Sequence, residues 1–398
     1  MIPVQEAMDR ILAAFTPLGS EIVALDRALG RVLAEPVVAR LDHPPQAVSA
    51  MDGYAVRAAD VAKLPARLRV IQEVAAGGLP ERAVEAGEAA RIFTGAAVPD
   101  GADTVVIQEN CTRDGDRVAV VDGSHERGRH IRSAGNDFRC GQIGIEAGYR
   151  LAPSHIGLAA AMNWPWLAVT RRPRGAVIST GNELAHPGET LKPGQIVASN
   201  GLALAAFVNS CGGDAIHLGI APDDENALSA MIDRAAGADL LLTSGGASVG
   251  DHDLVQSVLK SKGMALDFWK IAMRPGKPLM FGRLGGMGVI GLPGNPVSAL
   301  VTATLFVGPA IARMLGLRDI HPRVTHARLG RDLPASDSRQ DYLRAELREG
   351  EHGPVVTPFG KQDSAMLTAL SRSGALVVRP PHAPAAPAGS EVEIIRLN

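Results

Sequence analysis

The spacing of apolar and polar residues divides the chain into stretches with different periods. Apolar residues recur with helical spacing over residues 5–15 and 26–33, and prolines then interrupt that spacing. Between about residues 46 and 130, β-branched runs such as RLRVIQEV and RVAVVDG alternate with Gly, Pro and Asp turns. This alternation is typical of short antiparallel strands, and helical spacing returns in SHIGLAAAMN (154–163). We therefore predict a β-rich lobe inserted between two helical flanks.

The period changes again after Arg174, where short apolar runs bounded by glycine alternate with helical stretches. The predicted strands are GAVIST (175–180), DAIHLG (214–219), ADLLLTS (238–244) and GVIGLP (288–293). The predicted helices between them are GLALAAFVNSCG (201–212), ENALSAMIDRAAG (225–237) and LVQSVLKSKG (254–263). Apolar strands separated by helices predict βαβ units, and hence a mostly parallel sheet covered on both faces. After Gly316 the tail is β-like, with DYLRAEL, ALVVRP and EVEIIRL.

The composition makes several functions unlikely for a chain with this pattern. A chain of 398 residues predicts two to four domains, and 46% hydrophobic with 21% charged residues predicts globular ones. The aromatic content of 4% is low for stacking on bases, and the net charge of −2 gives no overall attraction for a polyanion. We therefore expect no nucleic-acid partner, and any phosphate must be bound by a local cluster of cations.

The cysteines and the apolar stretches bear on location. Cys111, Cys140 and Cys211 form no CxxC pair, so we expect a reducing cytoplasm rather than a disulfide framework or a structural zinc site. The stretch MIPVQEAMDRILAAF lacks a basic n-region and predicts an amphipathic helix rather than a signal peptide. SALVTATLFVGPAIARML is interrupted by Pro309 and Arg313 and predicts a buried helix, so we expect no membrane partner.

Two short motifs resemble nucleotide sites but lack the required context. GMGVIG (286–291) fits G-x-G-x-x-G, yet a predicted strand lies inside the match instead of before it, so a turn and a strand are favoured. PGKP around Lys277 has Pro278 where a P-loop needs Ser or Thr.

The stretch TSGGASVGDHD (243–253) contains the G-x-S-x-G pattern of a hydrolase nucleophile elbow. Gly245 and Gly246 separate Ser248 from the predicted strand, whereas the nucleophile of an elbow stands on the turn that leaves the strand. Ser248 and Asp251 also fit a helix cap, which we favour over a nucleophile. A glycine-rich backbone at a helix start then remains, and its amides can bind an anion.

Acidic residues follow several of the predicted strands. Asp251 and Asp253 stand in the first turn of a predicted helix, where carboxylates oppose the helix dipole whether or not they have a function. Glu183 follows the first strand and Asp223 the second. Ligands of open α/β sheets bind outside the carboxyl ends of the strands, so Glu183, Asp223 and Asp253 are expected to converge there. A hard cation such as Mg²⁺ would relieve their repulsion and bridge them to phosphates.

Cations are predicted near the same edge. Lys270, Arg274 and Lys277 lie around a Pro-Gly turn, although a solvated charged face is an equally good interpretation. In GLPGNPVSAL a strand ends in a turn that opens a helix, with Ser298 near its start. Two helix N-termini whose backbone amides can bind anions lie beside one basic turn. This arrangement indicates an extended ligand with more than one phosphate.

Long motifs along the chain resemble those of the molybdopterin molybdenumtransferases. The resemblance rests on SAMDGYAVRAAD (49–60), RIFTGAAVPDGADTVVIQE (91–109), IRSAGNDFRCGQIGIEAGYRL (131–151), STGNEL, TSGGASVGDHD, RPGKP and GLPGNPVSA. It implies an α/β multidomain fold with a mostly parallel α/β molybdopterin-binding domain, a helical segment, an inserted β-rich lobe and a C-terminal β-barrel. The implied bounds are 1–41 with 131–173 for the helical linking and dimerisation segment, 42–130 for the lobe, 174–318 for the α/β domain and 319–398 for the barrel.

The family's activity is the insertion of molybdate into adenylylated molybdopterin, with Mg²⁺ and release of AMP. The resemblance also implies a homodimer whose active cleft joins the α/β domain of one subunit to the β lobe of the other. Contacts that hand the cofactor to other molybdenum cofactor proteins are implied as well. This expectation agrees with the acid-rich, cation-flanked edge inferred from the residues.

The family's functional positions map onto individual residues of this chain. The expected catalytic residues are Asp52, Thr94, Asp137, Glu183, Asp223 and Asp253, of which Glu183, Asp223 and Asp253 are the expected Mg²⁺ ligands. The expected substrate and molybdate ligands are Ser244, Gly245, Gly246, Ser248, Lys270, Arg274, Lys277, Pro293, Asn295, Ser298, Arg344 and Ser364. Arg274 stands where some members have lysine, and Ala198 stands where a polar acid is expected.

Two other functions remain open on the sequence. A non-catalytic pterin-binding scaffold would keep the fold, as in gephyrin, which clusters receptors. A hydrolase of nucleotide pyrophosphates would share the Mg²⁺ site. Release of AMP from adenylylated molybdopterin, with and without molybdate, separates the transferase from both.

Overall fold

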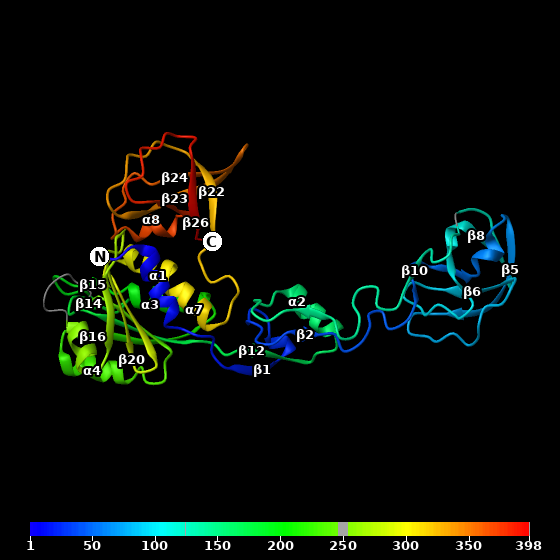
Figure 1. Cartoon of the computed structure of the whole chain (residues 1–398), viewed down its shortest axis with the longest axis horizontal. Helices are drawn as coiled ribbons and strands as arrows, with labels where there is room; N and C mark the ends of the chain where they lie inside the picture. The colour runs from blue at the N-terminus through cyan, green and yellow to red at the C-terminus, as the bar shows by residue number, and fades with distance from the viewer. Residues whose placement is uncertain (124, 246–253, 398) are drawn as a thin grey trace.

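The chain folds into an elongated molecule in which a β lobe lies far from the other large units (Figure 1). The computed structural model describes residues 1–123, 125–245 and 254–397. An α/β domain and a C-terminal barrel stack at one end, and a slender linking segment joins them to the lobe at the other end. The predicted multidomain α/β class is confirmed.

The α/β domain is built on one six-stranded sheet. Its strand order is β16 (Asp214–Ala221), β13 (Arg174–Thr180), β17 (Leu240–Ser244), β21 (Met287–Leu292), β20 (Pro278–Leu284) and β18 (Ala265–Lys270). The first four strands are parallel, whereas β20 and β18 are joined antiparallel. The four strands and their parallel pairing were predicted from the apolar runs. GMGVIG likewise belongs to a β20–β21 turn and to β21, as expected.

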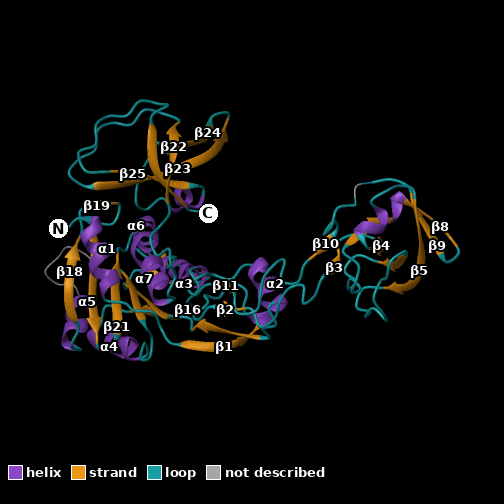
Figure 2. Cartoon of the chain, turned by 45° about the vertical axis from the view of Figure 1, so that its right-hand side comes forward, coloured by secondary structure: helices purple, strands orange, loops and turns teal. Residues whose placement is uncertain are grey.

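Helices cover both faces of this sheet because successive strand residues point to opposite sides. Val177 belongs to the core beneath α3 (Asn200–Ser210), α6 (Pro296–Thr302), the π-helix η4 (Ala303–Val307) and α7 (Gly308–Met314). Its neighbour Ile178 belongs to the core beneath α4 (Glu225–Asp233) and α5 (Leu254–Ser261). Figure 2 shows α3, α6 and α7 between the sheet and the barrel.

The first helix departs from the expected domain assignment. Helix α1 (Val4–Ala13) buries Ile11 and Leu12 in the core of the α/β domain, and the ring of Phe15 lies 6.4 Å from that of Phe281. Its amphipathic period predicted a helix but not the surface that covers its apolar face. The start of the segment 1–41 is therefore a part of the α/β core rather than of the linking segment.

The linking segment contains more strand than its predicted helical character implied. Residues 26–33 contain the end of the 3₁₀ turn η1 (Leu25–Arg27), a turn, and the isolated antiparallel bridges of Val32 to Arg150 and Leu33 to Val169, so the helix predicted there is wrong. The predicted helix near residue 154 is α2 (Pro153–Ala161). Antiparallel ribbons supply the rest: β1 (Ser20–Ala24) with β12 (Trp166–Thr170), β2 (Val37–Val38) with β11 (Ile143–Ile145), and β3 (Val48–Ser49) with β10 (Ile131–Arg132). Pairing with a distant strand outweighed the local helical spacing.

The inserted lobe is a six-stranded sheet with its own core. Its order is β7 (Thr104–Ile107), β4 (Gly53–Val56), β6 (Glu88–Ile92), β5 (Ala66–Val74), β9 (Arg117–Val120) and β8 (Cys111–Asp114). Only the β5–β6 pair is parallel. The short 3₁₀ turns η2 (Ala58–Val61) and η3 (Gln108–Asn110) complete it. The predicted β-rich character is borne out.

The C-terminal strands close into a five-stranded barrel. Around it run β22 (Val324–Leu329), β24 (Gly353–Pro358), β23 (Gln340–Gly350), β25 (Ala375–Arg379) and β26 (Glu391–Arg396), which pairs again with β22. Strand β19 (Met273–Arg274) of the α/β domain pairs with β23, and α8 (Leu367–Ser371) lies at the base. The basic turn of the α/β domain is therefore hydrogen-bonded to a strand of the barrel through β19.

One stretch of the described chain, Pro296–Met314, is long and apolar enough to span a membrane by length and composition. It comprises α6, η4 and α7, and 72% of its most apolar window is buried inside the fold. Val297, Phe306 and Ile311 belong to the main core. The stretch is thus a core helix, as its interrupting proline and arginine predicted.

Candidate active site

A cavity of about 310 Å³ opens at the carboxyl ends of β13, β17 and β21. Thr180 ends β13, Ser244 ends β17, and Gly294 follows β21, and all three line the cavity. The two-stranded ribbon of β14 (Leu184–Ala185) and β15 (Ile196–Val197) lines it as well. A cavity of this size at this edge of a doubly wound sheet is where such folds bind small molecules.

Two glycines form part of the wall, and only at Gly245 would a side chain clash. Gly245 has φ +93°, and a Cβ on it would lie 2.5 Å from the carbonyl oxygen of Thr180. A Cβ on Gly294 would lie 3.7 Å from the Cα of Gly245, which is ordinary contact. The backbones of the two loops therefore approach closely at the cavity wall.

Asn200, the first residue of α3, ties these loops together. Its Nδ2 donates to Ser244 Oγ at 2.8 Å and to the carbonyl oxygen of Gly294 at 2.7 Å. One side chain thus connects the start of α3 with the ends of β17 and β21.

Two of the three predicted acidic residues lie together at this edge. Glu183 lines the cavity. Asp223 Oδ2 accepts from the backbone N–H of Asn182 at 3.2 Å, and the N–H of Asp223 donates to Asn182 Oδ1 at 3.1 Å. Asn182 adjoins Glu183, so the two strand ends that carry Glu183 and Asp223 are joined by reciprocal hydrogen bonds.

The third acid and part of the glycine-rich loop lie outside the described residues. These are Gly246, Ser248, Asp251 and Asp253. Within the described ranges, no three His, Cys, Asp or Glu side chains form a metal-binding group. The expected ligand set therefore stays a prediction.

The barrel reaches the cavity through the loop that carries Ser364. Asn295 Nδ2 donates to Ser364 Oγ at 2.8 Å, and the N–H of Val297 donates to the carbonyl oxygen of Ser364 at 3.1 Å. Asn295 and Ala365 both line the cavity. Ser298 is buried in α6, and its carbonyl oxygen accepts from Thr302 Oγ1 at 2.7 Å. Pro293 directly follows β21 and begins the turn that positions Asn295.

Arg344 lies beneath that loop and is only 2% exposed. Its guanidinium donates to the carbonyl oxygens of Tyr342 at 3.4 Å and Asp363 at 3.3 Å, while its Nε has no hydrogen-bond partner in the described part of the chain. Burial lowers the pKa of Arg344 to about 10, so it stays cationic at neutral pH. No carboxylate within the described residues forms an ion pair with it, although the charge of Asp363 favours its cationic form.

The three cations of the basic turn have different partners. The Nζ of Lys270 lies 4.7 Å from the centre of the Trp269 ring. Arg274 donates from Nε and Nη2 to the two carboxylate oxygens of Asp341, at 2.8 and 2.9 Å. These hydrogen bonds raise the pKa of Arg274. Lys277 is exposed and forms no ion pair with the described residues. Of the three cations, it is therefore the most accessible to an anion.

The predicted residues of the lobe form a separate group. Asp52 Oδ1 accepts from the backbone N–H of Thr94 at 2.7 Å and from its hydroxyl at 2.8 Å. Both hydrogen bonds lower the pKa of Asp52, and the one from the backbone N–H has the larger effect. Asp137, which follows β10 in the linking segment, lines a second cavity of about 650 Å³ together with Gly95 of the lobe. Within one chain the lobe lies at the far end of the molecule from the α/β domain (Figure 1).

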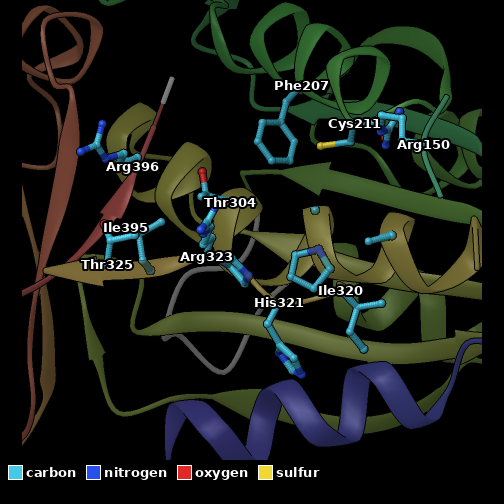
Figure 3. Close-up of a pocket in the computed structure, with 14 residues that line it drawn as sticks. Arg150, Phe207, Cys211, Thr304, Ile320, His321, Arg323, Thr325, Ile395 and Arg396 are labelled. Carbon is cyan, nitrogen blue, oxygen red and sulfur yellow. The ribbon is translucent and has the colours of Figure 1, made fainter. Parts of the chain in front are cut away.

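A third cavity, of about 320 Å³, lies where the linking segment, the α/β domain and the barrel meet (Figure 3). Phe207 comes from α3, Cys211 directly follows that helix, and Thr325 and Ile395 come from the barrel strands. None of the residues that line it is a predicted site residue.

Sequence reasoning missed several residues of the candidate site. Asn200 and Asn182 hold the loops of the cavity, and Asp341 holds Arg274. The two asparagines stand directly after a predicted strand or at the start of a predicted helix, which is a signal that would have placed them at this edge. Nothing local in the sequence connects Asp341 to Arg274, because the contact joins two domains.

Three family models match consecutive parts of the chain. Residues 2–163 match the "MoeA N-terminal region (domain I and II)", residues 176–313 the "Probable molybdopterin binding domain", and residues 326–397 the "MoeA C-terminal region (domain IV)". The matches leave only short joining segments between them.

Full-length relatives agree with these matches. The chain is 39% identical over 389 residues to a molybdopterin molybdenumtransferase of Nostoc, covering 95% of this chain and 89% of the relative. It is 36% identical to molybdopterin molybdenumtransferase 2 of Mycobacterium tuberculosis, covering 99% and 98%. The crystal structure of the molybdopterin biosynthesis MoeA protein of Pyrococcus horikoshii superposes with a TM-score of 0.86 at 34% identity, covering 100% and 99%.

Proposed function

Because the chain belongs to the molybdopterin molybdenumtransferase family, we propose that its carboxyl-edge cavity binds adenylylated molybdopterin and that molybdenum insertion there releases AMP. The family supports the coarser activity, insertion of molybdenum into molybdopterin. The observation that carries the finer proposal is the convergence of Glu183, Ser244 and Asn295 on one cavity. Acidic, hydroxyl and amide groups at one strand edge suit a phosphorylated heterocycle.

Charged groups around the cavity support the placement of the oxyanions. Lys277 is an exposed cation of the basic turn, and Arg344 is a buried cation beneath the loop of Ser364. We assign molybdate, the second substrate, to this barrel side, where Ser364 and Ser298 add hydroxyl groups. Arg274 contributes less directly, since its Nε and Nη2 already donate to Asp341.

Mg²⁺ fits the acids that the structure describes. Glu183 and Asp223 supply carboxylate oxygens from neighbouring strand ends, the donor type that Mg²⁺ prefers. Asp253 would complete the set. When bound, the ion neutralises phosphate charge that opposes cleavage. Asn182 holds the two acidic loops together, since its backbone N–H donates to Asp223 Oδ2 and its side-chain Oδ1 accepts from the N–H of Asp223.

A homodimer explains the separation of the two groups of site residues. The lobe that carries Asp52 and Thr94 lies at the opposite end of the molecule from the α/β domain that holds the cavity (Figure 1). We assign them, with Asp137, to the cavity of a second copy. Scattering in solution tests this assignment, because a strict monomer contradicts it.

The compartment proposed is the cytoplasm. Cys111, Cys140 and Cys211 are all free thiols, which suits a reducing environment. Hand-over of the finished cofactor to other molybdenum cofactor proteins is part of the same proposal.

Release of AMP from adenylylated molybdopterin tests the function directly. A transferase releases AMP only when molybdate is added, a hydrolase releases it regardless, and a scaffold releases none. Asp223→Ala and Asp253→Ala test the metal assignment. Turnover at the wild-type rate in both variants contradicts it.

A further inference from the structure

The amide of Asn200 has a fixed orientation. Both hydrogens of its Nδ2 are used inside the protein, on Ser244 Oγ and on the carbonyl oxygen of Gly294. Because a carbonyl oxygen only accepts, the opposite amide orientation would place two acceptors against each other. Asn200 Oδ1 is therefore the oxygen that remains.

That oxygen is an unused acceptor at the cavity. Asn200 lines the cavity, and no donor from the described residues reaches its Oδ1. Oδ1 is not fully buried either, because the fully buried polar atoms that lack a partner do not include it. It is therefore accessible to a ligand. The site thus presents an acceptor without an adjacent side-chain donor from the same amide.

The surrounding wall suits a flat ring. Ile196 and Val197 of β15 line the cavity although they are 57% and 45% exposed. Gly245 and Gly294 add backbone without side chains. Exposed apolar side chains beside bare backbone suit a planar heterocycle, which gains contact area on its faces and hydrogen bonds at its edge.

We propose that this cavity is the pterin subsite and that Asn200 Oδ1 accepts the adjacent N–H groups of the pterin's 2-amino-4-oxo edge. That edge carries two neighbouring donors, the ring N3–H and the 2-amino group. Adenine instead presents a donor next to an acceptor, and an asparagine reads it with both its oxygen and its NH₂. With its NH₂ committed, Asn200 selects the pterin over the adenine of the same substrate. The inference rests on the proposed function, since that function supplies the ligand.

The test compares binding of a simple pterin, its analogue methylated at N3 and the 2-amino group, and AMP, by fluorescence or calorimetry. Wild-type protein is expected to prefer the parent pterin over the methylated one by at least about 10-fold, because methylation removes the donors and leaves the acceptor unpaired. Asn200→Ala is expected to bind both pterins with equal, weakened affinity. Ser210→Ala, at the other end of α3, serves as the control and keeps the preference.

Loss of affinity for both pterins by the same factor would show that Asn200 only supports the loops, and would overturn the proposal. So would an unchanged preference in Asn200→Ala. A preference of the wild-type cavity for AMP over the pterin would reassign the subsite to adenine. Molybdate-dependent AMP release by the wild-type protein is measured alongside. It can succeed while the pterin preference fails, or the reverse, so the two proposals fail separately.

Discussion

Arg274 and Asp341 form a bidentate ion pair that joins the basic turn of the α/β domain to the barrel. The side chain of Asp341 is 7% exposed and that of Arg274 is 48% exposed, so the carboxylate is the buried partner. The pair also lies where β19 runs parallel to β23, with Arg274 opposite Asp341 in the register. A lysine cannot reproduce this two-pronged contact, so the arginine of this chain has a structural use here.

Asp341→Asn is expected to lower the free energy of unfolding by about 1.5–3 kcal/mol, because it removes charge-assisted hydrogen bonds at a buried site. Chemical denaturation measures the loss. Asp337→Asn is the matched control, since Asp337 is half-exposed and lies 3.5 Å from the same guanidinium. An equal loss in both variants would mean that the geometry of the Arg274–Asp341 pair has no special effect.

Gly245→Ala is expected to destabilise the fold by about 1–3 kcal/mol from its positive φ alone, with a further cost from contact with Thr180. Gly294→Ala is expected to change stability by less than about 0.5 kcal/mol, because its Cβ meets only ordinary contact. Thermal unfolding of the two variants side by side checks the difference. Equal melting temperatures would contradict the close approach at the cavity wall.

Arg344→Met is expected to keep the protein folded, with a loss below about 1 kcal/mol, since methionine fills similar space without a buried charge. Arg344→Ala is expected to lose about 2–5 kcal/mol through the cavity it leaves. If Arg344 binds an oxyanion, Arg344→Met should raise the molybdate concentration needed for half-maximal AMP release. Unchanged molybdate dependence in a folded Arg344→Met protein would remove Arg344 from the site.

Thr94→Val removes a hydroxyl that donates to Asp52 but keeps the backbone N–H. The pKa of Asp52 is lowered by these hydrogen bonds, so the variant should raise it part of the way toward its usual value. NMR titration of the carboxyl carbon measures the shift. Thr94→Ser retains the hydroxyl and should leave the pKa where it is.

The same substitution has a consequence for catalysis. If Asp52 acts as a carboxylate, the acidic limb of the rate profile should move to higher pH in Thr94→Val and not in Thr94→Ser. A profile that moves the same way in both variants would point to a change in packing instead.

Much of the α/β domain could be predicted from local patterns. The apolar runs ending at Thr180 and Ser244 predicted two strands of a mostly parallel sheet, which the structure shows to be neighbours, and the acids and glycines after them predicted the edge where a cavity opens. Such runs are informative because a strand buried on both faces needs apolar residues at nearly every position. The segment 26–33 shows the limit, since its helical spacing gave way to a 3₁₀ turn and to bridges of Val32 and Leu33 with distant residues.

The sequence by itself determined the order of strands and helices, the inserted lobe and the residues that carry charge, because these depend on neighbours along the chain. Tertiary structure decided that α1 packs in the α/β core and that Arg274 donates to Asp341. It also decided that Asn200 donates both amide hydrogens to two other loops. It also placed the lobe that carries Asp52 at the opposite end of the molecule from the α/β domain (Figure 1). Each of these depends on which surfaces meet in three dimensions, and contacts between residues far apart in sequence leave no periodic signal in a single chain.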